Sequence, residues 1–439
     1  MSESALSGRD VFIVDGARTP FLKARTGPGP FHAADLAVAC GRALLLRHEL
    51  APDAFDEVIV GCVGPTVDEA NIGRIVALRL GLSERTPAWT VARNCASGMQ
   101  ALDSAAKDIA TGRADLVLAG GAEAMSHAPV VLGERMVSWL GRWNTARSFG
   151  QRVATIGSLR PAFLAPVIGL LRGLRDPVVG LNMGQTAEKI AWMFGITRQQ
   201  MDEFSVESHG RVAAAADGGH FDAELTPVYD TRGNLYAADD GLRRDSSVEM
   251  LAKLKPFFDK PAGHVTPGNS SQITDGACLM LLASAEAVAR HGLPVLGRLV
   301  DVQWAALDPS IMGLGPAYAM APLLARHALA RDDIDFWEIN EAFAAQVLAC
   351  QAAWNDAQWC RTELGLDSPP GAIDPAKLNV DGGAIALGHP VGATGARIVL
   401  HLLQVLARNE ARRGIASLCI GGGQGGAVLV ERVITGAGA

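Results

Sequence analysis

The chain has 439 residues, of which 49% are hydrophobic and 5% aromatic, and it carries 49 glycines and a formal net charge of −7. This apolar content is enough for two or three domains or one large fused unit, and the acidic balance argues against nucleic acid as a partner. The composition is typical of an enzyme of mixed helices and strands with tight glycine turns.

The seven cysteines are odd in number and include no Cys-x-x-Cys pair. This pattern argues against a disulfide framework or a metal site and favours a reducing compartment. Residues 1–10 lack the basic-then-apolar order of a signal peptide, and no run approaches the ~18 apolar residues that span a bilayer. We therefore expect a cytoplasmic protein without a bound metal.

Extended and helical patterns alternate along the first part of the chain. Strands are predicted by apolar runs and helices by a 3.6-residue periodicity, in the order 10–15 (strand), 33–50 (helix), 57–63 (strand), 71–82 (helix), 99–109 (helix) and 115–119 (strand). Such alternation predicts a parallel or mixed sheet with helices on both faces.

The same order returns in the last third of the chain. Strands are expected at 295–302, 335–339, 415–420 and 427–432, and helices at 317–330, 341–353 and 393–409. In each half a long helix precedes a strand that runs into a glycine pair, which begins at Gly120 in the first half and at Gly421 in the second. This internal repeat predicts a duplicated, pseudo-symmetric architecture.

One long insertion interrupts the repeat. The last two strands of the second half are joined by a tight glycine hairpin, whereas their counterparts in the first half, near 116–119 and 278–283, lie far apart in sequence. We expect the segment between them to form a lid-like domain of its own. Within it, residues 183–194 and 197–216 read as helices and 239–260 mostly as loop.

The insertion begins with a basic and apolar stretch. Between residues 127 and 182 there are seven arginines and two acidic residues, and 159–174 is strongly apolar. Two interpretations are open. The stretch forms a solvated basic face with a core helix, or it contacts an anionic partner such as ligand phosphates, an acidic membrane surface or another subunit.

Cys95 stands where an extended stretch beginning at Thr90 gives way to a helical pattern from Met99. The N–H groups of a first helical turn lack intrahelical partners and carry partial positive charge, which makes a nearby sulfur easier to ionise. The thiolate is a nucleophile, so Cys95 is a candidate catalytic residue. The residues alone also allow Cys95 to be a small buried core side chain.

Three further stretches combine glycine or a strand end with a reactive group. His389 lies on a glycine-laced loop before a helix, Cys419 at a strand end before a glycine turn, and Asn340 at a strand-to-helix junction. Ligand sites of open α/β sheets lie where the strands end. We therefore expect these three residues and Cys95 to converge.

Five segments carry a resemblance to a known family. They are Asn-Cys-Ala-Ser-Gly around Cys95, Gly-Asn-Ser-Ser at 268–271, Asn-Glu-Ala-Phe-Ala-Ala-Gln at 340–346, the glycine-rich run at 382–397, and Cys-Ile-Gly-Gly-Gly-Gln-Gly-Gly-Ala at 419–427. In this order they resemble the thiolases, the acetyl-CoA C-acyltransferases, over nearly the whole chain. The resemblance implies two pseudo-symmetric βαβαβαββ halves in five α-β-α-β-α layers. The first half would be 1–126 with 266–290, the inserted loop domain 127–265 and the second half 291–439.

The resemblance also implies catalytic roles. Cys95 would accept the acyl group as a thioester, His389 would take the Cys95 proton, and Cys419 would exchange a proton with the reacting carbon of acetyl-CoA. The backbone N–H groups of Cys95 and Gly421 would bind the acyl oxygen. Asn340, through a water, and His389 would bind the thioester oxygen of acetyl-CoA.

Four more residues match positions that line the CoA or acyl path of thiolases: Ser271, Met183, Phe343 and Gly268. Simple packing would also account for Ser271 and Met183. The resemblance implies CoA as a cosubstrate rather than a permanently bound cofactor. It also implies a homodimer or homotetramer.

Two thiolase reactions compete: cleavage of longer 3-ketoacyl-CoA, and interconversion of acetoacetyl-CoA with two acetyl-CoA. Residues 148–153 and 163–166 resemble the β-subunit of the fatty-acid-oxidation multienzyme complex. That likeness favours 3-ketoacyl-CoA cleavage in fatty acid β-oxidation. It also implies docking to a hydratase/dehydrogenase α-subunit or a membrane through 127–182. Asn340 departs from this pattern, because those β-subunits carry histidine there.

Two other classes are alternatives. A ketoacyl synthase would share the duplicated fold and the nucleophile but carry two histidines and no second catalytic cysteine, so Cys419 argues against it. A non-catalytic lipid-carrier or scaffold subunit of this fold would have no need of the intact set Cys95, His389 and Cys419.

Overall fold

Ten strands form one mixed sheet in the computed structural model, which describes residues 8–433. The order is β12-β13-β14-β11-β1-β10-β5-β3-β4, with β2 beside β10. The first half supplies β1 (Val11–Arg18), β2 (Leu22–Lys23), β3 (Glu57–Gly61), β4 (Ala88–Val91), β5 (Leu116–Ala124) and β10 (Thr274–Ala283). The second half supplies β11 (Gly297–Ala306), β12 (Phe336–Ile339), β13 (Arg413–Ile420) and β14 (Gln424–Glu431).

Strand pairing confirms the duplication expected from the sequence. In the first half β10 pairs antiparallel with β1 and β5, and β3 pairs parallel with β5. In the second half β14 pairs antiparallel with β11 and β13, and β12 pairs parallel with β13. The two halves join where β1 pairs with β11.

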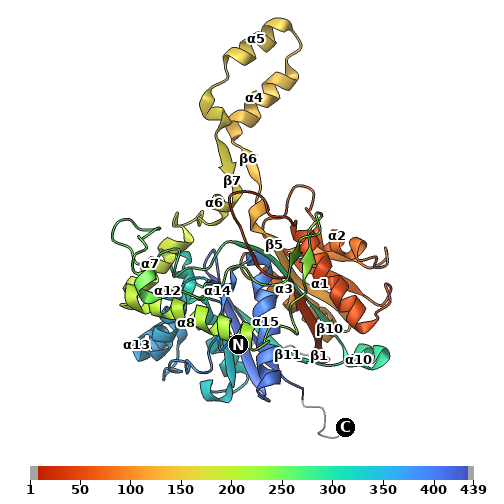
Figure 1. Cartoon of the computed structure of the whole chain (residues 1–439), viewed down its shortest axis with the longest axis vertical. Helices are drawn as coiled ribbons and strands as arrows, with labels where there is room; N and C mark the ends of the chain where they lie inside the picture. The colour runs from red at the N-terminus through yellow and green to blue at the C-terminus, as the bar shows by residue number, and fades with distance from the viewer. Residues whose placement is uncertain (1–7, 434–439) are drawn as a thin grey trace.

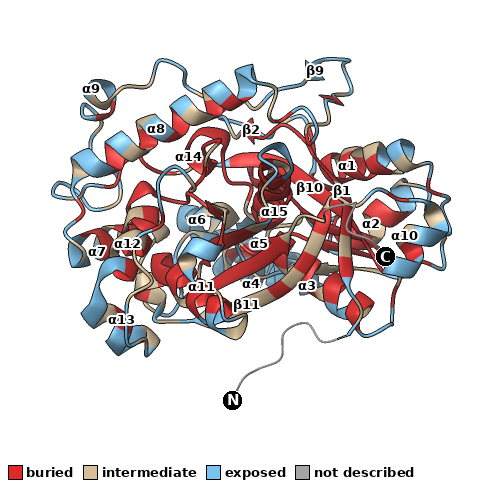
Figure 2. Ribbon diagram, turned by 90° about the horizontal axis from the view of Figure 1, so that it is seen from below, coloured by how far each residue is buried: buried red, intermediate tan, exposed pale blue. Residues whose placement is uncertain are grey.

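Two helices fill the space between the halves. α3 (Ser97–Ala110) packs on α15 (Val391–Arg408), and α15 also contacts β5, β10 and β13. Met99, Leu102 and Leu400 belong to one core cluster with strand residues of both halves. Figure 2 shows the strands and central helices as the most buried part of the molecule.

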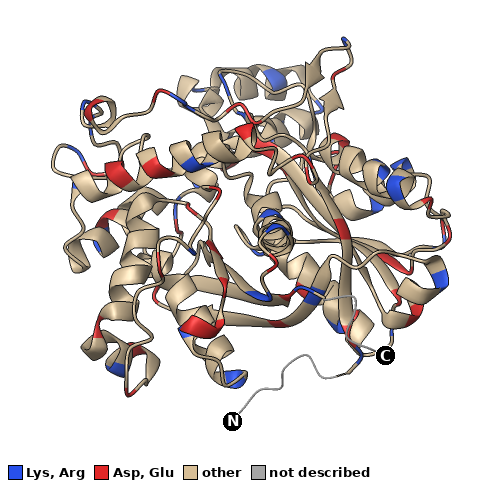
Figure 3. Cartoon of the chain, turned by 60° about the horizontal axis from the view of Figure 1, so that its bottom comes forward, with Lys and Arg blue, Asp and Glu red and all other residues tan. Residues whose placement is uncertain are grey.

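Further helices cover the outer faces and complete the expected layers. α1 (Ala33–His48) and α2 (Ile72–Arg79) pack on the first half, and α11 (Gly315–Arg326) and α12 (Ala344–Asn355) on the second. Because helices lie on both faces, β5 and β10 are buried along their whole length instead of alternating. Figure 3 shows charges of both signs interspersed over the outer helices and loops in view.

The insertion lies between β5 and β10 and has two parts. Residues 130–168, here called the arm, comprise β6 (Val130–Leu132), α4 (Glu134–Thr145), α5 (Phe149–Gly157), η2 (Pro161–Leu164) and β7 (Pro166–Ile168). Figure 1 shows the arm projecting from the body. After it come α6 (Gly169–Gly173), α7 (Met183–Met193) and α8 (Arg198–Asp217), and both long helices begin at capping boxes, as at Asn182 and Gln185.

The core-helix interpretation of residues 159–174 is wrong. This stretch is divided among η2, β7 and α6, and most of its apolar side chains are exposed or half-buried. Pro161 and Pro166 explain the interruption, because proline lacks an N–H donor and disfavours a helical residue before it. All seven arginines of 127–182 are exposed.

Short elements complete the chain. They are β8 (Val228–Tyr229), β9 (Leu235–Tyr236), α9 (Val248–Leu251), α10 (Ala285–His291), α13 (Ala357–Leu364), α14 (Ala384–Leu387), η1 (Met125–His127), η3 (Pro309–Leu314) and η4 (Arg331–Asp333). Within residues 8–433, every helix is too short or too polar to cross a bilayer.

Candidate active site

Cys95 lies in a tight turn between β4 and α3. Asn94 adopts a positive φ of 44°, which asparagine tolerates better than most residues. The Ser97 hydroxyl accepts a hydrogen bond from Arg93 N–H at 2.8 Å and donates one to Asn94 C=O at 2.7 Å. Asn94 Nδ2 donates to Gly421 C=O at 2.7 Å, which ties the turn to the loop after β13 in the other half.

His389 is held in one tautomer. Its Nδ1 lies 2.7 Å from Thr394 Oγ1, and that hydroxyl donates its only proton to Pro390 C=O at 3.0 Å. The ring must therefore carry its proton on Nδ1 and donate it to Thr394. The lone pair is left on Nε2, which has no hydrogen-bonding partner among the described residues.

Glycines let the starts of α3 and α15 approach each other closely. A Cβ placed on Gly98 would lie 2.7 Å from Gly392 C=O, and one on Gly395 would lie 2.7 Å from Met99 N. These separations are too short for any side chain, so the glycine-rich run before and within α15 serves close packing. The same packing brings the Cys95 turn and the His389 loop to one place.

Cys95, His389 and Cys419 line one cavity of about 460 Å³, here called the His389 cavity. Its wall also includes all four residues that the sequence associates with the CoA or acyl path: Ser271, Met183, Phe343 and Gly268. Three of the four residues expected to converge therefore meet at this cavity, whereas Asn340 is fully buried and is not among the lining residues.

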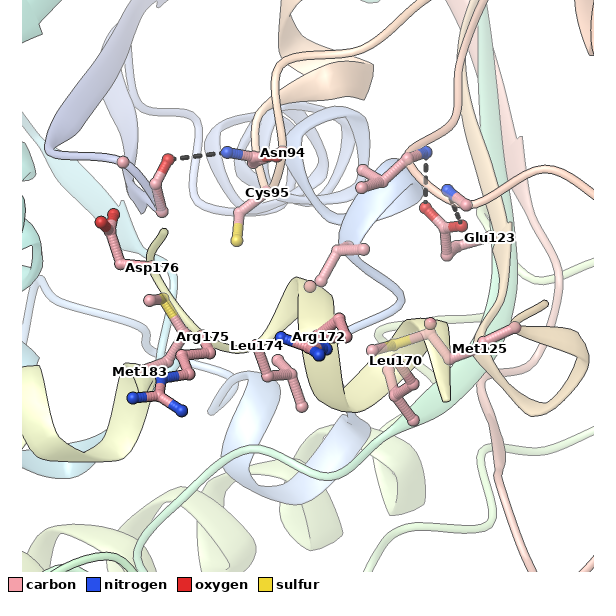
Figure 4. Close-up of a pocket in the computed structure, with 18 of the residues that line it drawn as sticks. Asn94, Cys95, Glu123, Met125, Leu170, Arg172, Leu174, Arg175, Asp176 and Met183 are labelled. Atoms are coloured by element: carbon pink, nitrogen blue, oxygen red, sulfur yellow. Dashed lines mark hydrogen bonds between the residues drawn. The ribbon is translucent and has the colours of Figure 1, made fainter. Parts of the chain in front are cut away.

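A second cavity of about 600 Å³ begins at Cys95 and is here called the Glu123 cavity (Figure 4). Cys95, Met125, Leu174 and Met183 line both cavities, and Gly421 lines only the second. Cys95 thus borders both cavities.

Burial dominates the protonation of the three reactive groups. It raises the pKa of the Cys95 thiol, although the N–H groups of Gly421 and Cys95 oppose that shift. Burial, reinforced by Arg397, lowers the pKa of His389 to about 3. Burial also raises the pKa of Cys419 well above its usual range. The backbone N–H groups therefore act in the direction expected from the sequence, but burial outweighs them, and both thiols keep their protons at pH 7 beside a neutral imidazole.

Two sets of hydrogen-bond donors surround this centre. The N–H groups of Cys95 and Gly421 interact with the Cys95 sulfur and lower the pKa of its thiol. The amide of Asn340 is fully buried, and neither its oxygen nor its nitrogen has a partner among the described residues. Buried polar groups are normally paired, so this amide is an exception among the described residues.

Sequence reasoning did not single out several residues that shape the site. Asn94 and Thr394 hold the Cys95 turn and His389, Phe258 packs its ring 6.0 Å from that of Phe343, and Arg243 lines the His389 cavity. Asn94 and Thr394 belong to the glycine motifs and were open to detection there. Phe258 and Arg243 carry no such signal. Within the described residues, no group of three or more His, Cys, Asp or Glu side chains is arranged to hold a metal ion.

Two family models match the chain: the thiolase N-terminal domain over residues 11–286 and the thiolase C-terminal domain over 293–432. The chain therefore belongs to the thiolase family. It is an acyltransferase with the thiolase fold, and the family acts on CoA thioesters.

Relatives of known name are similar over nearly their full length. The β-ketoadipyl-CoA thiolase of Pseudomonas aeruginosa is 40% identical over 433 residues, covering 97% of this chain and 100% of the relative. The mitochondrial trifunctional enzyme subunit beta of Homo sapiens is 36% identical over 424 residues, covering 96% of this chain and 88% of the relative. The crystal structure of human mitochondrial 3-ketoacyl-CoA thiolase in complex with CoA matches with a TM-score of 0.84 and 35% identity, covering 99% of this chain and 100% of that one.

Proposed function

We propose that this chain catalyses the CoA-dependent cleavage of 3-ketoacyl-CoA to acetyl-CoA and a shortened acyl-CoA, as in fatty acid β-oxidation. The observation that carries the proposal is the shared cavity of Cys95, Cys419 and a neutral His389 whose Nε2 is free to accept a proton. A nucleophile, a base and a second proton donor are what this cleavage needs.

The first half-reaction transfers the acyl group to the enzyme. Cys95 attacks the C3 carbonyl of the substrate while its proton passes to His389 Nε2, and the C2–C3 bond breaks. The electron pair left on C2 takes the Cys419 proton, which releases acetyl-CoA. Because the thiol pKa is raised and that of the imidazole lowered, proton transfer accompanies attack and does not precede it.

The second half-reaction restores the enzyme. The CoA thiol gives its proton to the Cys419 thiolate and attacks the Cys95 thioester. Cys95 leaves and regains the proton held by His389, so atoms and charge balance. The Cys95 and Gly421 N–H groups stabilise the acyl oxyanion, and His389 with Asn340, through a water, stabilises the thioester enolate.

Substitution of each sulfur tests this scheme. Cys95→Ala and Cys419→Ala should each lower kcat for thiolysis at least about a thousandfold, and Cys95→Ala should also abolish acyl-enzyme formation. Cys360→Ala, at a buried thiol of α13 outside both cavities, serves as the matched control. Thiolysis retained by Cys95→Ala would overturn the proposal.

The runner-up activity is interconversion of acetoacetyl-CoA with acetyl-CoA. The Glu123 cavity supports the longer substrates, since it adds about 600 Å³ of mostly apolar space beside Cys95. Values of kcat/KM for a series of 3-ketoacyl-CoA substrates of increasing chain length distinguish these two activities. A steep fall beyond four acyl carbons would favour the acetoacetyl reaction.

We also propose the division into 1–126 with 266–290, an inserted domain at 127–265, and 291–439. The pairing of β5 with β10 at the two ends of the insertion supports it.

The seven free thiols support a location in a reducing compartment such as the cytoplasm. A homodimer or homotetramer is supported by β4, a half-exposed strand whose one partner among residues 8–433 is β3. Light scattering of the purified chain measures the oligomeric state.

The arm supports a second role, docking on an acidic membrane surface. It exposes Val137 (57%), Phe149 (85%), Val153 (52%) and Ile156 (55%) beside its arginines, which is the mixture that binds such surfaces. Leu132 pairs with Pro166, so residues 133–165 are replaceable by an Asn-Gly turn that leaves α6 intact. The shortened chain should keep thiolysis and lose binding to anionic vesicles. Loss of copurification with a hydratase/dehydrogenase subunit instead would assign the arm to that partner.

A further inference from the structure

The Glu123 cavity has an uneven distribution of charge. Most of its wall is apolar, including Met125, Leu170 and Leu174, and four ionisable side chains also line it: Glu123, Arg172, Arg175 and Asp176. The orientation of the substrate at Cys95 determines which of its parts contacts these side chains. Since His389 and Cys419 act on the acetyl-CoA portion in the other cavity, the acyl chain beyond C3 extends into this one.

Both carboxylates of this cavity are already engaged. Glu123 accepts hydrogen bonds from the N–H groups of Val63 and Gly64, both at 2.9 Å. Asp176 caps the turn that follows it, with two backbone N–H donors at 2.8 and 3.0 Å. Each residue is at most 3% exposed. Neither carboxylate forms an ion pair with an arginine of the cavity.

Arg172 and Arg175, in contrast to the two carboxylates, have side-chain nitrogens without hydrogen-bonding partners among the described residues. Arg172, on α6, is exposed, and its guanidinium has no hydrogen-bonding or ionic partner within residues 8–433. Arg175 donates from Nε to Gly180 C=O at 3.0 Å, which leaves its two terminal nitrogens unengaged. Figure 4 shows Arg172 and Leu174 on the wall across the cavity from Cys95.

We propose that the Glu123 cavity accepts 3-ketoacyl chains ending in a carboxylate and that Arg172, assisted by Arg175, binds that carboxylate. A guanidinium matches a carboxylate with two parallel hydrogen bonds and remains charged at all relevant pH. The apolar wall accommodates the methylene carbons between C3 and the charged end. This proposal rests on the proposed function and names its substrate class.

The phosphates of CoA are the competing anion for these arginines. Lys23 and Arg243 line the His389 cavity, so cations are also available on the side that the acetyl-CoA portion occupies. A role in CoA binding would change the KM for CoA and weaken every substrate equally. A role in acyl recognition changes only substrates with a terminal carboxylate.

Two six-carbon substrates separate these roles: 3-ketoadipyl-CoA, which ends in a carboxylate, and 3-ketohexanoyl-CoA, which ends in a methyl group. The native enzyme should have the higher kcat/KM on the adipyl substrate. Arg172→Gln should lower that value about tenfold or more and leave the hexanoyl value and the KM for CoA within about twofold. The double variant with Arg175→Gln should lose more.

Arg160→Gln provides the matched control, since Arg160 is an exposed arginine of the arm outside both cavities. Equal losses on the two substrates, or no preference in the native enzyme, would overturn carboxylate recognition while leaving thiolysis established. Absence of thiolysis with every 3-ketoacyl-CoA would overturn the proposed function itself. Hexanoyl activity retained by each variant shows that it is folded.

Discussion

The positions of the reactive side chains depend on hydrogen bonds from residues that take no direct part in the reaction. The Thr394 hydroxyl faces His389 and decides which ring nitrogen holds the proton, and the Asn94 amide holds the Gly421 loop beside Cys95. Neither Thr394 nor Asn94 is needed as an acid, base or nucleophile. Substitutions at these positions should therefore alter rate constants with little effect on substrate affinity.

Thr394→Val removes the hydroxyl while keeping a branched side chain of similar shape. The buried Nδ1–H would lose its acceptor and the tautomer would no longer be fixed, so we expect kcat to fall about tenfold or more. Thr394→Ser, which keeps the hydroxyl, should stay close to the native rate. Steady-state thiolysis assays of both variants measure the difference, and equal rates would contradict the assigned role of Thr394.

The pKa of His389 sets the acid side of the pH profile. Burial and Arg397 lower this pKa to about 3, so the imidazole stays neutral and able to accept a proton far below pH 7. We expect kcat/KM for thiolysis to hold its value from pH 7 down to about 5, since this parameter reports the free enzyme. A half-maximal point near 6.5, the ordinary histidine value, would contradict the assignment.

At the scale of helices and strands, the site depends on the close packing of α3 against α15. A Cβ on Gly395 would meet the backbone nitrogen and the Cβ of Met99 at 2.7 and 2.8 Å. Gly395→Ala should therefore lower the free energy of unfolding by about 2 kcal/mol and separate Cys95 from His389 enough to reduce kcat. Denaturant titration and thiolysis assays measure both effects.

The control for that substitution is Gly141→Ala in α4, where a new Cβ meets nothing within 4 Å. It should be neutral or stabilise by up to about 1 kcal/mol, because alanine is the better helix former. Equal destabilisation by Gly141→Ala and Gly395→Ala would show that close approach of the two central helices is not the cause.

Local sequence patterns predicted most helices and strands. The features that were not predicted depend on contacts between residues far apart in the chain. The main strands and longer helices of both halves were predicted to within a few residues, because apolar runs and periodicity follow from burial on the sheet, whereas β2, α10, α13 and α14 were not predicted. Cys95, His389 and Cys419 were singled out because each stands beside the predicted end of a strand or start of a helix, in a motif that resembles the thiolases. The basic stretch suggested an anionic partner but did not single out Arg172, since its place on a cavity wall depends on how the insertion folds back. The stretch 159–174 was misread because its apolar content outweighed its two prolines.

At the scale of the whole molecule, a buried charge network joins the insertion to both halves. His401 of α15 lies 3.0 Å from Glu224 and 3.1 Å from Asp381, and Arg18 of β1 lies 2.6 Å from Glu224. Arg408 also pairs with Asp381 at 2.7 Å. Two carboxylates around one imidazole favour its charged form against the cost of burial.

His401 should make stability depend on pH. Burial lowers the pKa of His401, but Glu224 and Asp381 together outweigh it and raise the pKa from 6.5 to about 9. Its contribution, on the order of 3 kcal/mol, is complete below about 6.5 and is lost as pH rises through 9. Replacement by His401→Gln should destabilise the protein more at pH 6 than at pH 9.

Thermal unfolding of His401→Gln at both pH values measures this, with His291→Gln, at the half-buried end of α10, as the control. A loss of stability that is the same at pH 6 and pH 9 would mean that His401 is neutral in the native protein. It would then act through packing alone.

The pairing of β10 between β1 and β5 has a consequence for how the protein is made. β1 and β5 are both complete by residue 124, yet the strand that belongs between them ends at residue 283. On the ribosome, the first half therefore waits with its central position empty until the entire insertion has been translated. Until β10 is made, β1 lacks both of its partners, β10 and β11, and β5 pairs with β3 alone, and such unpaired apolar strands favour aggregation and chaperone binding.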